Sequence, residues 1–170
     1  VSDDNGTKGF VSAQYIDFKN GTKPANKTEN ATSAIKNTAS TSSSSKLSNK
    51  RTYNGKTIDV NELIEYSKQF IGTPYVYGGT DLENGVDCSG FVMSVYKNFG
   101  VQLNRVSRDM YLQGTAVQRA DLEPGDLLFF NTGGNSIISH VGMYIGNDEY
   151  IHSTNGAGDG VTISSMNDGY

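Results

Sequence analysis

Cys88, His140 and His152 are the residues of this sequence whose types and spacing favour covalent chemistry. Cys88 is the only cysteine in 170 residues, so it has no partner for an intrachain disulfide, and the two histidines are the only ones in the chain. A thiol, an imidazole base and a second ring that orients the base form the minimum set for a cysteine nucleophile.

Two other interpretations use the same three side chains. A free cysteine is often a small buried apolar residue, with the histidines equally structural. A Cys/His/His set can also bind zinc with one open position, but the separations here (140 − 88 and 152 − 140) lack the short pairs typical of zinc sites. The neighbours Asp87, Ser89 and Gly90 suit the start of a helix better than a core wall. We therefore expect a nucleophile, with no metal ion and no other cofactor.

The predicted helix from about Cys88 to Phe99 places the thiol in a first helical turn. Free N–H groups and the helix dipole there favour an anion, and a neighbouring imidazolium would favour it further, so we expect a thiol pKa below its usual value of ~8.5. The same N–H groups can hold an oxyanion. Asp87 opposes the thiolate, and we expect it to bind a cationic group of the substrate.

Two predicted strands, His140–Ile145 and Glu149–Ser153, bring the histidines together. With a three-residue loop at 146–148, Ile145 faces Glu149, and the period of two puts both imidazoles on one face of the sheet. A two-residue loop would instead put them on opposite faces.

In the favoured register Gly142 faces His152 and leaves room for its ring. His140 and His152 are then diagonal neighbours, with backbones roughly 7–8 Å apart. We expect His140 to be the general base and His152 to orient it and fix its tautomer.

The remaining pattern predicts an α+β fold, because helices come first and a small antiparallel sheet follows. A first helix is expected over Ile58–Ile71, with Asp59 near its start and Ile71 on its buried face. Ser107 starts a short helix that Gly114 stops. The predicted strands are Leu127–Asn131, His140–Ile145, Glu149–Ser153 and Val161–Ser164.

Charge and composition divide the chain into three parts. Residues 19–52 are rich in Ser, Thr, Asn and Lys and predict a flexible linker, whose lysines could lie along an anionic polymer. Residues 53–170 form the globular part. That part is acidic, within a net charge of −4 for the whole chain, which argues against nucleic acid as a partner. No apolar run approaches the ~20 residues of a membrane span.

The first eighteen residues form the third part. Lys8–Ile16 resembles the closing segment of a bacterial SH3-like domain, so residues 1–18 are expected to be the C-terminal remnant of such a domain. The N-terminus at Val1 is not a signal peptide, and we expect the sequence to be part of a longer or processed protein.

Four motifs of the globular part closely resemble the NlpC/P60 family of papain-like cysteine peptidases, which cut bacterial cell-wall peptides. The resemblance covers about residues 58–165, with the motifs in the family's order and spacing. They are Gly72-Thr73-Pro74-Tyr75-Val76-Tyr77-Gly78-Gly79, Asp87-Cys88-Ser89-Gly90-Phe91, Leu122-Glu123-Pro124-Gly125-Asp126-Leu127-Leu128-Phe129-Phe130 and Ser139-His140-Val141-Gly142-Met143-Tyr144-Ile145-Gly146.

The resemblance implies a papain-like fold and a catalytic triad of Cys88, His140 and His152. It implies hydrolysis of peptidoglycan stem peptides, most often at the γ-D-glutamyl–diamino acid bond, by a monomer that is secreted or associated with the cell wall. It also implies a set of residues that bind the L-Ala–γ-D-Glu end of the substrate, with Asp87 on the ammonium and Arg105 on the α-carboxylate. These are Tyr75, Asp87, Ser89, Arg105 and Ser107.

The chain departs from the family pattern in two places. Tyr77 stands where the family often has Trp, and the family's sheet usually has one more strand after the region of Val161–Ser164. Three alternatives keep the same residues: an N-acetylmuramoyl-L-alanine amidase, an acyltransferase, and a wall-binding module without activity. For Arg105 a surface role, and for Tyr75 a packing role, stay open as well.

Overall fold

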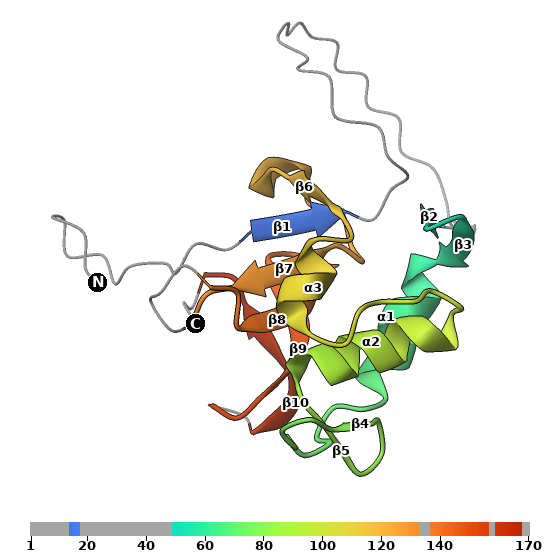
Figure 1. Cartoon of the computed structure of the whole chain (residues 1–170). Coiled ribbons are helices and arrows are strands. Elements are labelled where there is room, and N and C mark those ends of the chain that lie inside the picture. Colours follow the sequence, from blue (N-terminus) through green and yellow to red (C-terminus); the bar gives the residue numbers. More distant parts are fainter. Residues whose placement is uncertain (1–13, 18–48, 133–136, 157–158, 168–170) are drawn as a thin grey trace, which may run out of the picture.

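The computed structural model describes residues 14–17, 49–132, 137–156 and 159–167 (Figure 1). These ranges contain ten strands, three α-helices and a 3-10 helix. In chain order they are β1 (Gln14–Asp17), β2 (Lys50–Tyr53), β3 (Lys56–Asp59), α1 (Val60–Lys68), β4 (Thr80–Asp81), β5 (Gly85–Val86), α2 (Cys88–Asn98), α3 (Ser107–Tyr111), β6 (Thr115–Val117), η1 (Arg119–Asp121), β7 (Leu127–Phe130), β8 (His140–Gly146), β9 (Glu149–Thr154) and β10 (Gly160–Ser165).

The main sheet has six strands in the order β10-β9-β8-β7-β1-β6, all antiparallel to their neighbours. Strand β1 comes from the part of the chain that precedes the predicted linker, yet it lies between β7 and β6 (Figure 1). The first thirteen residues of the SH3-like segment lie outside the described residues, so that assignment stays a prediction.

The globular part begins earlier than the sequence indicates. Strand β2 covers Lys50, Arg51 and Thr52, which the sequence assigns to the linker; the linker up to residue 48 lies outside the described residues. Arg51 explains why this polar segment packs against the globular part, because its guanidinium is buried and forms a 2.7 Å ion pair with the buried Asp126. That contact ties the β2–β3 hairpin to the start of β7.

The first helix is shorter than predicted. Ile58 belongs to β3, and α1 begins at Val60 because the Asp59 side chain accepts hydrogen bonds from the next free backbone N–H groups. The helix ends at Lys68, so Ile71 lies beyond it and is 51% exposed rather than buried. The second helix, α2, has the predicted start at Cys88 and is followed by Gly100 with a positive φ of 78°.

Helix α2 carries the apolar face that positions the site. Its side chains Phe91, Val92 and Val95 are buried in one core with alternate residues of β7, β8 and β9, and α2 contacts both β8 and β9. Strand β7 is buried on both faces, since Leu128 and Phe130 belong to a second cluster on the other side of the sheet. Figure 1 shows α2 alongside the sheet, with its first turn nearest to β9 and β10.

The hairpin that carries the histidines differs from prediction at its tip. The loop has two residues, Asn147 and Asp148, both with positive φ (56° and 58°), and Gly146 rather than Ile145 pairs with Glu149. A β-bulge just before Gly146 absorbs the extra residue.

Beyond the bulge the register is the predicted one, with Met143 opposite Ile151. The close approach at Gly142 is also confirmed: a Cβ there would lie 3.2 Å from the Cβ of His152 and 2.7 Å from Cδ2 of Tyr150. The two-residue loop therefore does not move the histidines to opposite faces.

Within the described ranges, no helix is long and apolar enough to cross a membrane. The mixture of helices and a mainly antiparallel sheet agrees with the predicted α+β class.

Candidate active site

The nucleophile candidate stands at the first position of α2, and Asp87 is the N-cap that starts this helix. Its carboxylate accepts hydrogen bonds from the backbone N–H groups of Gly90 (2.7 Å) and Gly78 (2.9 Å). One side chain thus holds both the helix start and the glycine-rich turn beside it. The sequence-based reason for Asp87, a cationic substrate group, overlooks this role, although Asp is a favoured N-cap residue.

Two glycines allow that turn to lie directly on the helix start. A Cβ at position 90 would overlap the carbonyl oxygen of Gly79, and a Cβ at position 79 would lie 2.5 Å from the carbonyl oxygen of Gly85. The backbone N–H of Asp87 donates to that same Gly79 carbonyl at 3.2 Å. The glycine motif is therefore a packing requirement that fixes where Cys88 begins its helix.

Cys88 is only 8% exposed, but it is not sealed from solvent. It opens into two cavities, one of about 380 Å³ and one of about 510 Å³, which meet at Tyr75, Cys88 and Ser139. We call the first the histidine cavity, because His140, His152 and Ser164 line it, and the second the arginine cavity, because Arg105 and Arg108 line it.

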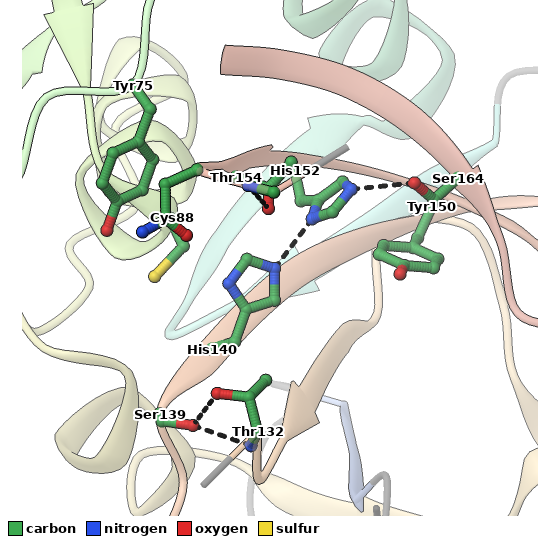
Figure 2. A pocket seen from close by; sticks show the side chains of 11 residues that line it. Tyr75, Cys88, Thr132, Ser139, His140, Tyr150, His152, Thr154 and Ser164 are labelled. Atoms are coloured by element: carbon green, nitrogen blue, oxygen red, sulfur yellow. Dashed lines mark hydrogen bonds between the residues drawn. The ribbon is translucent and has the colours of Figure 1, made fainter. Parts of the chain in front are cut away.

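The structure brings the two histidines into contact. Nε2 of His140 lies 2.7 Å from Nδ1 of His152, and their ring centroids are 5.0 Å apart at 83°. Nε2 of His152 in turn lies 2.9 Å from Oγ of Ser164 on β10. Figure 2 shows the remaining nitrogen of His140, Nδ1, turned toward Cys88. The three residues that the sequence singles out are therefore neighbours, in the order thiol, base and orienting ring.

Aromatic side chains pack around the histidine pair. The Phe130 ring centroid lies 5.7 Å from that of His140, and the Tyr150 centroid lies 4.7 Å from that of His152. His152 is 1% exposed as a result. This packing holds both rings in one orientation.

Burial changes the acid–base properties of both histidines in the same direction. It lowers the pKa of His140 well below the usual 6.5, and the neighbouring His152 lowers it further. Burial also lowers the pKa of His152 to about 4. Both rings are therefore neutral near pH 7.

The predicted lowering of the thiol pKa is wrong for this site. Burial, together with the adjacent Asp87 carboxylate, raises the pKa of Cys88 above its usual value, even though backbone N–H groups of Val141, Ser89 and Cys88 itself favour the thiolate. The helix start favours the thiolate, but the desolvation of the sulfur outweighs it. A neutral thiol beside a neutral imidazole follows, rather than an ion pair.

Asp87 and Arg105 do not stand free for a substrate. The Arg105 guanidinium donates to both Asp87 oxygens, at 3.0 and 2.7 Å, and to Oγ of Ser89 at 3.0 Å. Burial would raise the pKa of Asp87, but the hydrogen bonds from Arg105 and the backbone outweigh it and the pKa is lowered. Their pairing satisfies the charges that the resemblance assigns to the substrate's ammonium and α-carboxylate.

The other expected substrate-binding residues line the cavities. Tyr75 borders both of them and stands beside Cys88 in Figure 2, whereas Ser89 and Ser107 line only the arginine cavity. Ser107 is buried in the first turn of α3.

Sequence reasoning missed three side chains of this site. Ser139 lines both cavities and is hydrogen-bonded to Thr132 (2.7 Å between hydroxyl oxygens), and Ser164 contacts His152. Arg108 lines the arginine cavity, is exposed and has no ion pair with the described residues. A signal was available for Ser164, because it follows Thr162, the partner of His152 in the β9–β10 ladder, by two residues.

Among the residues that the structure describes, no group of three or more His, Cys, Asp or Glu side chains is arranged to hold a metal ion.

Residues 72–170, more than half of the chain, match the NlpC/P60 family. The chain belongs to this family. The match confirms the resemblance carried by the four sequence motifs, and Cys88, His140 and His152 all lie within the matched residues.

Several curated proteins are similar to this NlpC/P60 chain. A Haemophilus influenzae protein described as a probable endopeptidase is 42% identical over 110 residues, covering 64% of this chain and 66% of that protein. A γ-D-glutamyl-L-lysine dipeptidyl-peptidase of Bacillus cereus is 42% identical over 93 residues, covering 54% and 28%. The murein DD-endopeptidase MepH of Escherichia coli is 39% identical over 105 residues, covering 60% and 38%. The chain thus spans between 28% and 66% of the lengths of these relatives.

Solved structures support the same fold. An NlpC/P60 family protein from Bacillus cereus matches with a TM-score of 0.59 at 38% identity, covering 64% of this chain and 35% of that one. The NlpC/P60 domain of the peptidoglycan hydrolase SagA matches with a TM-score of 0.57 at 32% identity, covering 65% and 92%. The predicted α+β NlpC/P60 fold is confirmed at this level.

Proposed function

We propose that this protein is a cysteine endopeptidase that hydrolyses the stem peptides of peptidoglycan at the γ-D-glutamyl–diamino acid bond. The single observation that carries the proposal is the arrangement of Cys88 with His140, which is turned toward the thiol and hydrogen-bonded to His152, in a site open to solvent through two cavities. The named activities of the relatives, murein endopeptidase and γ-D-glutamyl-L-lysine dipeptidyl-peptidase, support the substrate class. Such an enzyme works at the cell wall.

The proposed reaction begins with a neutral thiol. As Sγ of Cys88 attacks the scissile carbonyl carbon, its proton passes to Nδ1 of His140, and the imidazolium keeps its Nε2–H on His152. Backbone N–H groups at the start of α2 are suited to hold the oxyanion. His140 then gives the proton to the leaving amine, and a thioester on Cys88 remains.

Hydrolysis of the thioester reverses these roles. His140, neutral again, removes a proton from water, the hydroxide attacks the thioester carbonyl, and the thiolate that leaves recovers its proton. Bonds and protons balance without a cofactor, and His152 stays neutral throughout because its pKa is lowered to about 4.

We propose that the arginine cavity holds the L-Ala–γ-D-Glu side of the stem peptide, with Tyr75, Ser89 and Ser107 on its walls. Asp87 and Arg105 contribute to this side as a fixed ion pair, and a substrate that bound either charge directly would have to displace the other. The histidine cavity is then the side of the leaving diamino acid.

The proposal is tested by digesting two defined peptidoglycans, with diaminopimelate or lysine at stem position three, and identifying the fragments by mass spectrometry. We expect a new α-amine on the diamino acid. A free L-alanine amine with intact stems would instead indicate an amidase, and products without a water-derived oxygen in H₂¹⁸O an acyltransferase. Intact substrate in both digests would contradict a hydrolytic function.

A further inference from the structure

The histidine pair ends on a hydroxyl that the catalytic triad does not include. Oγ of Ser164 lies 2.9 Å from Nε2 of His152, and it lines the same cavity as Cys88 and His140 (Figure 2). In the β9–β10 ladder, Thr162 is opposite His152 and Ser164 is opposite Tyr150. Because residues two apart share a face, Ser164 is held on the face of the sheet that carries His152.

The direction of each hydrogen bond follows from the chemistry. For His140 to accept the thiol proton, its Nδ1 must carry a lone pair, so its own proton must be on Nε2. That proton points at Nδ1 of His152, 2.7 Å away, which must then be the acceptor. His152 therefore carries its single proton on Nε2, and this N–H needs an acceptor.

Ser164 is the acceptor that the geometry provides. A neutral histidine with a protonated Nδ1 would give the opposite order, in which His152 donates to His140 and the His140 proton blocks the thiol. A hydroxyl can serve either order while both rings are neutral. Once His140 becomes an imidazolium, however, only one order remains, because both of its nitrogens carry protons and His152 must accept.

We propose that Ser164 is a positioning residue, which accepts the Nε2–H of His152 and so stabilises the tautomer in which His140 can act as the base. The thiol proton moves to Nδ1 of His140 during attack, while the Nε2 protons of both rings stay in place. Ser164 thus stabilises the imidazolium through His152 and does not itself touch the substrate's reacting atoms. This inference rests on the proposed function, but the tautomer can be measured without any turnover.

The tautomer can be read from ¹⁵N chemical shifts of the imidazoles. The chain has two histidines, so ¹⁵N-histidine labelling gives two ring systems, and His152→Gln identifies which is which. We expect His152 to show a protonated Nε2 and an unprotonated Nδ1 at pH 7. A His152 that carries its proton on Nδ1 would overturn the proposal, whether or not the protein cleaves peptidoglycan.

Three variants test the role of the hydroxyl. Ser164→Ala is expected to lower kcat roughly tenfold with little change in KM, as for the loss of one hydrogen bond to a charged network, and to leave His152 in a mixture of tautomers. Ser164→Thr, which keeps an oxygen at the same place, should restore both. Ser165→Ala is the matched control, since the Ser165 hydroxyl accepts a hydrogen bond from the backbone N–H of Asn167 and does not contact the histidines.

Each readout can overturn the proposal. If Ser164→Ala keeps either the wild-type kcat or the single His152 tautomer, the positioning role is wrong. If Ser165→Ala lowers kcat as much as Ser164→Ala, the effect belongs to strand β10 in general. An absence of activity in the wild-type protein would contradict the proposed function alone, because the ¹⁵N shifts still decide the tautomer.

Discussion

The two cavities that meet at Cys88 differ in the ionisation of the side chains that line them. In the arginine cavity, Asp87 and Arg105 are ionised and satisfied by each other, by Ser89 and by backbone N–H groups. In the histidine cavity, two titratable rings are buried beside each other and both are neutral. One side of the sulfur holds permanent charge, and the other holds protons that can move.

This difference separates scaffold from chemistry. The Asp87 carboxylate fixes the start of α2 and thereby the position of the thiol, but burial and, after it, this carboxylate raise the pKa of Cys88. The histidine pair compensates, because a neutral base can remove the thiol proton at the moment of attack. Some residues of the site therefore set its geometry, and others move protons.

The largest loss of activity is expected when the thiol or its base is removed. Cys88→Ala should reduce peptide hydrolysis by at least about a thousandfold, as should His140→Ala, since each removes a member of a unit that acts together. Near-wild-type unfolding curves for both variants would show that the loss is chemical. Residual turnover within tenfold of wild type in Cys88→Ala would assign the chemistry to another residue.

The buried neutral histidines of the histidine cavity should also make the free energy of unfolding depend on pH in a defined window. The folded pKa of His152 is about 4, below its unfolded value near 6.5, so the unfolded chain binds the extra proton first as the pH falls. The contribution of neutral His152 to stability is thus fully present above pH 6.5. As the pH falls to 4, the titration of His152 alone should lower the free energy of unfolding by about 3 kcal/mol. Urea titrations at a series of pH values measure this.

His152→Gln is the matched variant for that slope, because it removes one titrating ring and keeps a polar side chain. The curve between pH 6.5 and 4 should become shallower. The Asp87 carboxylate belongs to a separate window, since its pKa is lowered from 3.8 and its contribution is lost only at more acid pH. An unchanged slope in His152→Gln would mean that His152 is not buried neutral.

Loss of the Asp87–Arg105 ion pair in the arginine cavity should cause a smaller change in the free energy of unfolding. Arg105→Gln leaves the buried Asp87 carboxylate without its main partner, and we expect about 1–2 kcal/mol of destabilisation, reduced by the 36% exposure of the arginine side chain. The control is Arg119→Gln, whose exposed ion pair with Asp148 at 3.3 Å should contribute less than about 0.5 kcal/mol. Equal effects in the two variants would refute a scaffold role for Arg105.

The smallest effect is expected at Arg108, the cation of the arginine cavity that has no ion pair within the described residues. If the cavity receives the γ-D-Glu part of the stem, Arg108→Gln should raise KM about three- to tenfold for a substrate with a free α-carboxylate. A substrate with an α-carboxamide should show no change. Equal KM changes for both substrates would remove Arg108 from substrate selection.

The sequence predicted the histidine side of the site better than the arginine side. Alternation along β8 and β9 places His140, Gly142 and His152 together, because a period of two follows from strand geometry alone. The prediction survived a wrong loop length, since the bulge before Gly146 restored the register. Bulges depend on tertiary packing and leave little trace in a single sequence.

The arginine side could not be derived in the same way. Arg105 reaches Asp87 across eighteen positions of chain, and only the folded structure shows that each satisfies the other. The predicted lowering of the thiol pKa was wrong for a related reason, because desolvation depends on how the folded chain surrounds the sulfur. Asp87 as an N-cap was within reach, since it directly precedes a predicted helix. The β2–β3 hairpin was hidden because Arg51, a charged residue in a polar stretch, is buried by its pairing with Asp126.

The most direct test of the central claim is to trap the covalent intermediate. The protein is mixed with a stem peptide, quenched in acid within one turnover, digested and mapped by mass spectrometry. We predict an acyl group that contains the γ-D-glutamyl residue, attached through a thioester to the peptide that carries Cys88, and its absence in Cys88→Ala. Cleaved substrate without any acyl adduct on Cys88, or an adduct on another residue, would contradict the account.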